Sequence, residues 1–405
     1  MRYTELTVAG KAPALKKPFL VYDKRRAYTM KKFISMAMAG CMALSLAACG
    51  GSSASTAEST ATSTEATSEA AASGSKTDVA FVTDVGNIDD QSFNQYTWQG
   101  VQDFCSANSL NANYYRPTED SDAARLEQMD NAVNDGAKAI VVAGYLFGSS
   151  IAEAQTKYPD VEFLALDVST SDLGDTAPAE NTALITYKEE QAGYLAGYAA
   201  VYDGYKELGF LGGMAVPAVI RYGYGFVQGA DAAAKELGVN DVNIKYWYSG
   251  GFAATDEVKN KMDGWYSEGT EVVFACGGPV CQSCDAAAQA NGGKMIGVDV
   301  DQSGQFDTVI TSATKGLAES VNEALTDSLN NGWKFTEAYS GKETKLGAAE
   351  NCVGLPMETS KFNKFTQEQY DAMYASIVDG TLVIDDSFDT AVTPSVTNVT
   401  VDYQG

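Results

Sequence analysis

Residues 78–107 read DVAFVTDVGNIDDQSFNQYTWQGVQDFCSA. The apolar run Val79–Thr83 is typical of a buried strand, and residues 92–107 carry apolar side chains at helical spacing. A polar loop that opens with Asp84 separates the two segments. A short buried strand followed by a helix is the repeating unit of proteins built on parallel β-sheets. We therefore expect the same strand–helix unit to repeat along the rest of the chain.

The same alternation continues to about residue 335. Further strands are predicted at Ala139–Ala143, Val161–Leu166, Leu208–Gly212, Ile244–Tyr248, Val272–Ala275, Met295–Val298 and Thr308–Ser312. Further helices are predicted at 121–135, 148–157, 189–203, 220–237, 255–267, 280–291 and 315–331. Strands joined by crossover helices form parallel sheets whose two faces are both covered. Because 405 residues are too many for one typical core, we predict an α/β protein of two lobes.

Acidic residues and glycines follow several of these strands at their carboxyl ends. Asp84, Asp167 and Asp299 each come directly after a predicted strand, and Gly277 and Gly278 follow another. Ligands of open α/β sheets bind beyond the carboxyl ends of the strands. Any one of these residues could be an ordinary strand cap or turn residue. Three carboxylates together favour recognition of hydroxyl groups, because a carboxylate can accept hydrogen bonds from two vicinal hydroxyls of a sugar.

The composition excludes several classes of function. The chain contains no histidine, which excludes Ser-His-Asp and Cys-His nucleophilic sites and zinc sites that use histidine. The net charge is −25, and residues 1–48 carry nine Lys or Arg against two Asp or Glu, so the remainder is more acidic still. A surface this negative repels nucleic acids and anionic lipid headgroups. We expect no nucleic-acid partner and no cofactor, whereas an uncharged ligand is compatible with this charge.

The N-terminal region predicts an export signal and a lipid anchor. Lys31 and Lys32 precede an apolar stretch, residues 33–48, that is too short to span a membrane comfortably. The stretch ends in LAACG, from Leu46 through Cys49 to the next glycine, which resembles a bacterial lipobox. Small residues there admit the signal peptidase, and the cysteine thiol carries the diacylglyceryl group that anchors the protein. We predict Cys49 as the lipidation site.

The segments around this signal complete the predicted organisation. Residues 1–29 do not resemble part of a signal, and we interpret them as an upstream extension of a signal peptide at 30–48. Residues 49–77 contain, after the cysteine, almost only Ser, Ala, Thr, Gly and Glu. Such a composition cannot bury enough apolar surface to offset the entropy of ordering, which predicts a disordered tether. The folded part is then held on the extracytoplasmic face of the cell membrane.

Five stretches in the folded part, taken in order, resemble the basic membrane protein family. They are TDVGNIDDQSFN at 83–94, QAGYLAG at 191–197, GFLGG at 209–213 with the later pairs Gly225-Phe226 and Gly229-Ala230, IGVDVDQ at 296–302, and TSATK at 311–315. The family consists of substrate-binding lipoproteins of ABC transporters, and its characterised members resemble purine nucleoside receptors. The resemblance covers roughly residues 78–335.

This resemblance implies the type I periplasmic-binding-protein fold, in which two Rossmann-like lobes close on a ligand between them. Lobe 1 is expected at 78–187 plus 300–335, and lobe 2 at 188–299 plus 336–405. The chain is expected to cross the hinge near 187, 299 and 336. The implied partners are a nucleoside and an ABC transporter permease, and the implied function is capture of the nucleoside for uptake, without catalysis.

The resemblance also implies residues that contact the base. The aspartate after the first strand contacts the purine edge in the family, and that position is Asp84 here. The phenylalanine of the Ser-Phe-Asn motif stacks on the base; here it is Phe93, although it could instead face the core. Asn94 either bonds to the base or holds the loop. A second aromatic residue from the other lobe is assigned to Phe252, although its surroundings, with Ala254 in place of the usual aspartate, depart from the family pattern. The alternative aromatic partners are Tyr222, Tyr246, Trp247 and Tyr248.

The ribose hydroxyls are held in the family by aspartates and a lysine. The matching positions here are Asp167, Asp299 and Lys315, and Gly277 or Gly278 would let the backbone approach the sugar. Because Lys315 opens a predicted helix, it could also be a solvated residue of the first helical turn.

The cysteines leave further questions open at this point. After Cys49 the chain contains Cys105, Cys276, Cys281, Cys284 and Cys352, an odd number. An odd number outside the cell leaves at least one thiol unpaired, and a disulfide within 276–284 is plausible although its partners cannot be assigned. Three thiolates could also bind a soft metal, but we predict no metal site.

Two other functions are open to the same sequence. The fold could bind a sugar or a sugar-like signal molecule, because sugar receptors of related fold also use carboxylates and aromatic stacking. The chain could also be a lipid-anchored glycosidase that uses Asp89 with Asp90, or Asp299 with Asp301. Such close neighbours point in different directions on a strand or loop, which makes them poor acid–base pairs. We therefore predict a binding protein rather than an enzyme.

Overall fold

The computed structural model describes residues 76–84 and 86–404. The predicted upstream extension, the signal peptide, Cys49 and nearly all of the tether lie outside the described residues. The last residue of the predicted tether already belongs to the folded structure. Thr77 is buried, and its N–H donates to the carbonyl oxygen of Asp135 at 3.0 Å. The folded part therefore begins no later than Thr77.

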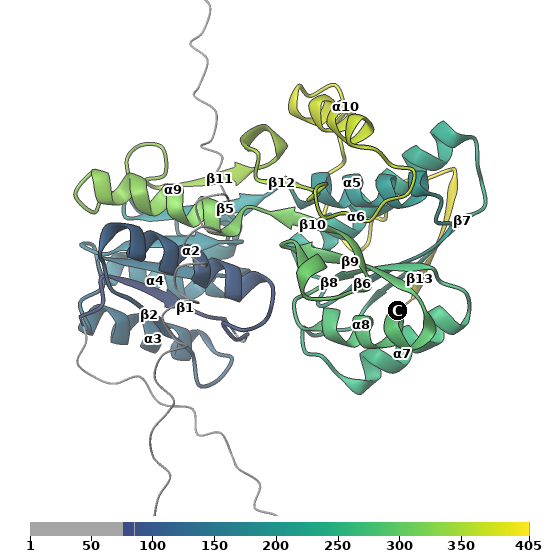
Figure 1. Cartoon of the computed structure of the whole chain (residues 1–405). Coiled ribbons are helices and arrows are strands. Elements are labelled where there is room, and N and C mark those ends of the chain that lie inside the picture. The colour runs from purple at the N-terminus through teal and green to yellow at the C-terminus, as the bar shows by residue number, and fades with distance from the viewer. Residues whose placement is uncertain (1–75, 85, 405) are drawn as a thin grey trace, which may run out of the picture. The chain divides into compact units, whose positions relative to one another are not determined.

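The first lobe is built on a six-stranded sheet in the order β11-β5-β4-β3-β1-β2, in which all neighbours are parallel. The strands are β1 (Val79–Val82), β2 (Ala112–Tyr115), β3 (Ala139–Ala143), β4 (Glu162–Leu166), β5 (Thr182–Tyr187) and β11 (Lys342–Leu346). One face is covered by α2 (Phe93–Asn108) and α9 (Leu317–Asn330), and the other by α3 (Asp122–Asn134) and α4 (Gly148–Lys157) (Figure 1). Because both faces are covered, β1, β3, β4 and β5 are buried along their whole length.

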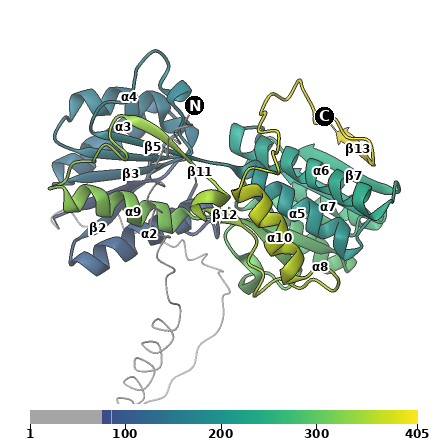
Figure 2. The same cartoon turned by 90° about the horizontal axis from the view of Figure 1, so that it is seen from above.

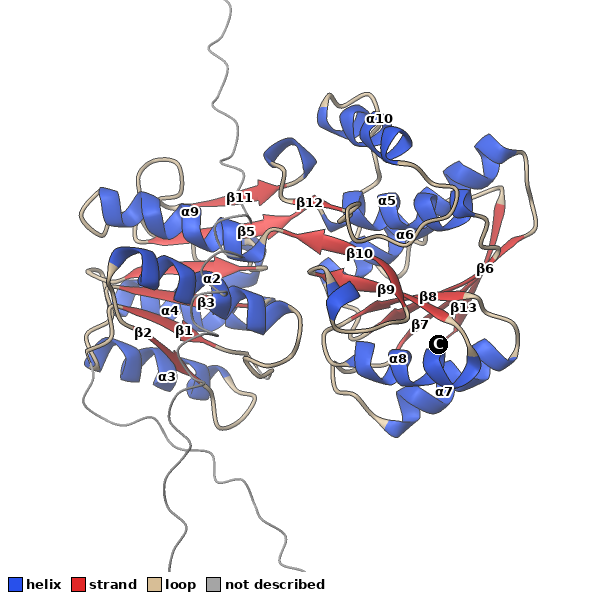
Figure 3. Cartoon of the chain, viewed as in Figure 1, coloured by secondary structure: helices blue, strands red, loops and turns tan. Residues whose placement is uncertain are grey.

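The second lobe is built on a seven-stranded sheet in the order β12-β10-β9-β8-β6-β7-β13 (Figure 3). The strands are β6 (Glu207–Gly212), β7 (Val242–Tyr248), β8 (Val272–Cys276), β9 (Lys294–Asp299), β10 (Val309–Lys315), β12 (Val353–Gly354) and β13 (Val399–Gln404). Helices α5 (Glu189–Asp203) and α6 (Pro217–Leu237) cover one face, and α7 (Asp256–Ser267) and α8 (Val280–Asn291) cover the other. β12 pairs with β10 in the antiparallel sense, and the other pairs are parallel.

The two sheets share one strand order. The sequence β5-β4-β3-β1-β2 in the first sheet corresponds to β10-β9-β8-β6-β7 in the second. The carboxyl end of β4 in one lobe is therefore equivalent to that of β9 in the other. This doubly wound arrangement places ligand sites beyond the carboxyl ends of the strands, and it confirms the predicted α/β fold of two Rossmann-like lobes.

The lobe boundaries differ from the predicted ones in two places. Strand β10 pairs with β9, so residues 309–315 belong to the second lobe rather than the first. Strand β11 pairs with β5, so residues 342–346 belong to the first lobe rather than the second. The chain passes between the sheets after Tyr187, after Lys315 and after Leu346 (Figure 2). The first crossing lies where the sequence predicts it, and the other two lie further along the chain.

Helices α5 and α6 pack at short separation because glycines line their contact. A Cβ atom at Gly193 or Gly197 would lie within 2.1 Å of a carbonyl oxygen of α6. A Cβ atom at Gly225 or Gly229 would lie equally close to a carbonyl oxygen of α5. The glycine-rich motifs in these helices therefore have a packing role, which fixes the position of α6 beside the strand ends.

The C-terminal part of the chain lies on the second lobe. Helix α10 (Gln367–Val378) packs on α5, and β13 extends the sheet at the edge of β7. Residues 379–398 connect them without a helix or strand, and we call this segment the strap. Within the described residues, none of the helices is both long enough and apolar enough to cross a membrane.

Candidate ligand-binding site

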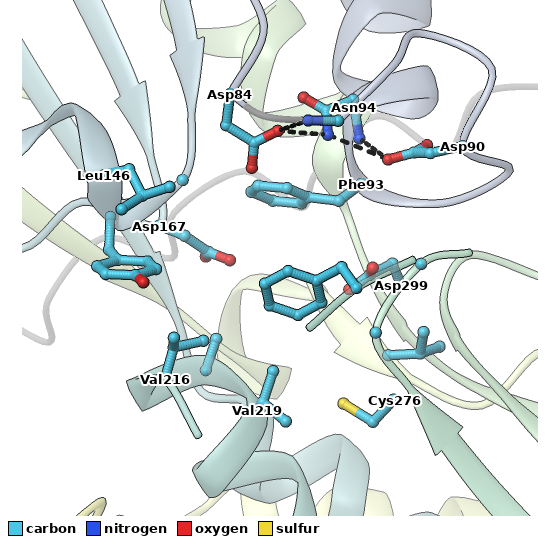
Figure 4. A pocket seen from close by; sticks show the side chains of 18 of the residues that line it. Asp84, Asp90, Phe93, Asn94, Leu146, Asp167, Val216, Val219, Cys276 and Asp299 are labelled. Atoms are coloured by element: carbon cyan, nitrogen blue, oxygen red, sulfur yellow. Dashed lines mark hydrogen bonds between the residues drawn. The ribbon is translucent and has the colours of Figure 1, made fainter. Parts of the chain in front are cut away.

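A cavity of about 970 Å³ is lined by residues from both lobes. Ligand pockets for small organic molecules have volumes of this order. Every ligand-binding residue predicted from the sequence lines this cavity. They are Asp84, Phe93, Asn94, Asp167, Phe252, Gly277, Asp299 and Lys315. Figure 4 labels Asp84, Phe93, Asn94, Asp167 and Asp299 among them. The structure thus brings together residues from six separate segments of the chain.

Asp90 holds the loop that joins β1 to α2. Its Oδ1 accepts hydrogen bonds from the N–H groups of Ser92 (2.9 Å) and Gln95 (3.0 Å). Its Oδ2 accepts from the N–H (2.9 Å) and from Nδ2 (3.1 Å) of Asn94. A carboxylate at this end of a helix satisfies N–H groups that lack partners within the helix. The loop so held presents Phe93, the first residue of α2, to the cavity (Figure 4).

Asp84 and Asn94 place hydrogen-bond acceptors at one end of the cavity. Asp84 Oδ1 accepts from the N–H of Gly86 (2.7 Å) and from Nδ2 of Asn94 (3.1 Å). Because Nδ2 donates to two carboxylates, Asn94 Oδ1 points away from both; it is buried, and no described residue donates to it. Burial raises the pKa of Asp84 to about 6. This end of the cavity offers an unpartnered acceptor to an N–H group of a ligand.

Aromatic rings enter the cavity from both lobes. Phe93 comes from the first lobe, and Phe252 comes from the turn after β7 in the second. A Cβ atom at Gly213 would lie 2.4 Å from the ring of Phe252, so the glycine leaves room for that ring. The ammonium nitrogen of Lys315 lies 4.9 Å from the centroid of the Phe93 ring, within cation–π distance.

Asp167 and Asp299 occupy equivalent places in the two lobes and share an uncommon backbone conformation. Asp167 follows β4 with φ of 53°, and Asp299 ends β9 with φ of 65°. Left-handed conformations are uncommon outside glycine, although aspartate tolerates them better than most residues, and such conformations cluster at ligand sites. Asp299 Oδ2 accepts a hydrogen bond of 2.5 Å from Ser92 Oγ of the other lobe. Asp167 Oδ1 is buried and receives no hydrogen bond from any described residue.

Lys315 joins these carboxylates in one buried charge network. Its Nζ lies 2.6 Å from Asp167 Oδ2, 3.4 Å from Glu189 Oε1 and 3.8 Å from Asp299 Oδ1. Glu189 Oε2 in turn accepts from Nε of Arg221 at 2.7 Å. Burial raises the pKa of Asp167 to about 6. Burial also opposes ionisation of Glu189, but Arg221 and Lys315 outweigh it and lower the pKa of that carboxyl.

Lys315 does not begin a helix, so the predicted helix start at this residue is wrong. It is the last residue of β10, where it pairs with Val353, and α9 begins only at Leu317. Its side chain is 2% exposed, which also excludes a solvated residue in the first turn of a helix. The pairing with β12 extends β10 past the point where its apolar pattern ends.

Two residues of the site were not predicted for it from the sequence. Glu189 and Arg221 form the second half of the charge network. Tyr222, which the sequence offers as an alternative aromatic partner, lines the cavity with its ring 5.7 Å from Lys315 Nζ. The hydroxyl of Tyr222 is buried and has no hydrogen-bond partner among the described residues. The sequence does contain a signal that could have identified Arg221, because it is a charged residue inside an apolar stretch. It lies within the first turns of α6, which are otherwise uncharged.

Gly277 brings two strand ends together at the cavity wall. It follows β8, and a Cβ atom there would lie 3.1 Å from backbone atoms of Gly213, which follows β6. A side chain at Gly277 would therefore force these ends apart. Gly277 lines the cavity, as do the other residues for which the sequence predicts contact with a sugar.

The cysteines in the described part of the chain are all buried free thiols. Cys281 Sγ donates to the carbonyl oxygen of Ala275 (3.3 Å), and Cys284 Sγ lies 3.6 Å from the hydroxyl of Tyr266. The thiols thus face separate partners, and the disulfide considered within 276–284 is not formed. Among the described residues, no three Cys, Asp or Glu side chains are placed to hold a metal ion.

In each pair considered for a glycosidase, one carboxylate accepts hydrogen bonds from other groups of the protein. Both oxygens of Asp90 hold the loop before α2. Asp301 accepts from the N–H of Ser303 (3.1 Å) and from Oγ1 of Thr359 (2.7 Å), outside the cavity. Neither pair presents two free carboxyl groups to one ligand.

The fold and the cavity define a two-lobed binding protein. Residues 77–387 match the family described as ABC transporter substrate-binding protein PnrA-like, and the chain belongs to this family. Substrate-binding proteins of ABC transporters take up a small molecule and deliver it to a permease. The family resemblance predicted from the sequence motifs is confirmed.

Curated relatives match most of the chain at modest identity. The CD4+ T-cell-stimulating antigen of Listeria innocua is 26% identical over 76% of this chain and 87% of its own length. Basic membrane protein A of Borreliella burgdorferi is 27% identical over 74% of this chain and 85% of its own length. The ABC transporter nucleoside-binding protein BmpA of Lactococcus lactis subsp. cremoris is 28% identical over 56% of this chain and 65% of its own length.

Solved structures confirm the fold. An ABC transporter solute-binding protein from Aeropyrum pernix K1 superposes with a TM-score of 0.65 at 20% identity, over 78% of this chain and 95% of that one. A solute-binding protein from Conexibacter woesei superposes with a TM-score of 0.62 at 20% identity, over 76% of this chain and 99% of that one. The predicted type I periplasmic-binding-protein fold is thereby confirmed.

Proposed function

We propose that this protein is a lipid-anchored receptor that captures a nucleoside, preferably a purine nucleoside, for uptake through an ABC transporter. The observation that carries the proposal is that the cavity combines two chemically different sets of side chains. Asp84, Phe93 and Asn94 supply an aromatic face with acceptors, and Asp167 and Asp299 supply carboxylates. A nucleoside has the same two parts, a flat base with N–H groups and a sugar with vicinal hydroxyls.

The base is assigned to the end that carries Asp84 and Asn94. Stacking on Phe93 and Phe252 contributes about 1–3 kcal/mol and discriminates little between bases. Selection among bases then depends on polar groups. Asn94 Oδ1 and the ionised carboxylate of Asp84 are both acceptors, so they favour a base edge that presents N–H donors.

The sugar is assigned to the charge network around Lys315. Asp167 Oδ1 has no donor among the described residues, so a sugar hydroxyl supplies the hydrogen bond that this buried atom lacks. Lys315 favours the ionised form of both carboxylates, against the effect of burial, and is itself a donor to a hydroxyl oxygen. Hydrogen bonds to charged groups each contribute about 1.5–3 kcal/mol.

The relative from Lactococcus lactis that is called nucleoside-binding supports this ligand class. The proposed anchor is Cys49, which lies outside the described residues and follows the sequence motif alone. The receptor is then held on the outer face of the cell membrane by its lipid, and a transporter permease is its second partner. No step of this function requires catalysis.

A thermal-shift screen of the purified protein tests this function. The panel contains purine and pyrimidine nucleosides, free bases, ribose, other sugars and amino acids. A ligand present at 100 times its dissociation constant adds about 2.7 kcal/mol to the stability of the native state. We expect nucleosides to raise the melting temperature, and free bases and ribose alone to have little effect. A shift with sugars alone would instead identify a sugar receptor, and no shift with any nucleoside would refute the proposal.

A further inference from the structure

The strap is fixed to one face of α6. Tyr224, Gln228 and Asp231 follow one another at helical spacing on that face. The Tyr224 hydroxyl donates to the carbonyl oxygen of Asp389 (3.2 Å), and Gln228 exchanges two hydrogen bonds of 3.0 Å with the backbone of Asp385. Asp231 Oδ1 accepts from two consecutive N–H groups near the end of the strap, at 2.9 and 2.6 Å. The strap therefore has a defined path over the second lobe.

The strap also reaches the first lobe and the cavity. Asp386 forms an ion pair of 2.7 Å with Lys345, which belongs to β11 of the first lobe. Two residues further on, Phe388 lies with its ring 5.7 Å from the guanidinium carbon of Arg221, and both line the cavity. Phe388 is 53% exposed, so one side of the ring meets solvent while the other faces the cavity. Phe388 thus forms part of the cavity mouth.

This part of the cavity lies at the sugar end of the proposed site. Arg221 is bonded to Glu189, and Glu189 is bonded to Lys315, which contacts both Asp167 and Asp299. A chain of direct contacts therefore links the phenyl ring to the carboxylates assigned to the sugar. Phe388 lies one residue beyond the 77–387 match to the family.

We propose that Phe388 contacts the ligand and limits the size of the group that a nucleoside carries at its 5′ carbon. The inference rests on the proposed function, because it takes the sugar to lie at Asp167 and Asp299. When carboxylates hold the 2′ and 3′ hydroxyls, the 5′ carbon is the part of the sugar left to point towards Arg221. The phenyl ring excludes bulky 5′ substituents by contact and shields Arg221 from water.

Isothermal titration calorimetry of the whole protein tests this role. The ligands are guanosine, adenosine and inosine, each with its 5′-O-benzyl ether, which is uncharged. Wild type is expected to bind the parent nucleosides at least about tenfold more tightly than the ethers, as steric exclusion in a fitted pocket allows. Phe388→Ala is expected to reduce that ratio to about threefold or less. The matched control is Val383→Ala, because Val383 lies in the same strap, is 84% exposed and does not line the cavity.

The outcomes separate this inference from the proposed function. Wild type that binds no nucleoside refutes the proposed function, and the inference falls with it. Wild type that binds nucleosides while Phe388→Ala leaves the ratio unchanged refutes the inference alone. A Phe388→Trp variant provides a second measurement that does not depend on the alanine variant folding. Its additional fluorescence is expected to change when guanosine binds, whereas that of Val383→Trp is not, and equal responses would contradict the contact.

Discussion

Asp299 shows at the scale of one residue how the site constrains the backbone. Its φ of 65° turns the carboxylate toward Lys315 and Ser92. Aspartate and asparagine tolerate this conformation better than alanine. Asparagine is therefore the substitution that removes the charge without adding backbone strain.

We predict that Asp299→Asn weakens nucleoside binding about tenfold to a hundredfold, because it removes one charged hydrogen bond of about 1.5–3 kcal/mol. The melting temperature without ligand should change little, since Lys315 keeps Asp167 and Glu189 as partners. Asp301→Asn is the control, because Asp301 lies outside the cavity. Calorimetric titration measures the nucleoside affinity of both variants. Equal affinity of Asp299→Asn and wild type would show that the Asp299 carboxylate does not bind the ligand.

Glu190 is a second residue whose chemistry follows from its burial. Its Oε2 is buried without a described partner, and burial, followed by the charge of Glu189, raises the pKa of its carboxyl from 4.5 to about 7. The folded state therefore binds this proton more strongly than the unfolded state. The resulting stabilisation is complete below about pH 4.5 and is lost as the pH rises to about 7.

We predict that Glu190→Gln loses less stability than wild type as the pH rises from 4.5 to 8, because glutamine carries no proton to release. Chemical denaturation at a series of pH values measures the free energy of unfolding of both proteins. Glu153→Gln, which changes an exposed glutamate of α4, is the control. Parallel curves for Glu190→Gln and wild type would show that Glu190 does not titrate in this range.

At the same scale, the sequence predicts residues that line the cavity better than it predicts the residues that support them. Asp84, Asp167 and Asp299 follow strands, and the strand ends of a doubly wound sheet meet at the site. Glu189 follows β5, a strand that was not predicted, so nothing marked it as lying at a strand end. The left-handed backbone of Asp167 and Asp299 is likewise set by the folded loops and has no separate sequence signal.

At the scale of elements, buried strands are easier to predict than edge strands. The strands at the centres of the two sheets are short apolar runs that are buried on both faces. Strands β2, β11 and β13 lie at sheet edges and are only partly buried, so their pattern resembles that of a loop. Strand β5 is an exception, because it is buried along its whole length and was still not predicted. One misplaced lobe boundary follows from the missed strand β11, which pairs with β5. The other has a different cause: β10 was predicted as a strand, but it was assigned to the first lobe within residues 300–335.

The contact between α5 and α6 gives a prediction at this scale. A Cβ atom at Gly197 would lie 2.0 Å from the carbonyl oxygen of Phe226, a backbone atom that cannot move without displacing α6. We predict that Gly197→Ala destabilises the protein by about 2 kcal/mol or more. Gly264→Ala is the control, because this glycine lies within α7 with no atom near its added Cβ, and alanine there should stabilise by about 0.5–1 kcal/mol. Thermal unfolding measures both, and equal effects would contradict the close packing.

At the scale of the whole molecule, the excess of negative charge destabilises the compact folded state. The chain carries 28 Lys or Arg against 53 Asp or Glu, and all of the acidic excess lies beyond residue 48, because residues 1–48 are net positive. Like charges at this density repel one another in the folded state, and dissolved salt screens that repulsion. Buried ion pairs such as Lys315 with Asp167 are screened much less.

We therefore predict that the melting temperature rises by a few degrees when sodium chloride is increased from low to physiological concentration at pH 7.5. The rise should be smaller near the isoelectric point of about 4.3, where the net charge is small. Differential scanning calorimetry at both pH values measures it. A melting temperature that falls with salt at pH 7.5 would show that favourable surface pairs outweigh the net repulsion.

The most direct test of the central claim is a crystal structure of the protein grown with a purine nucleoside. We expect one nucleoside in the cavity, with the base between Phe93 and Phe252 and beside Asp84, and with the sugar hydroxyls on Asp167 and Asp299. A nucleoside bound outside the cavity, or bound with its base at the charge network, would show that the proposed site is wrong.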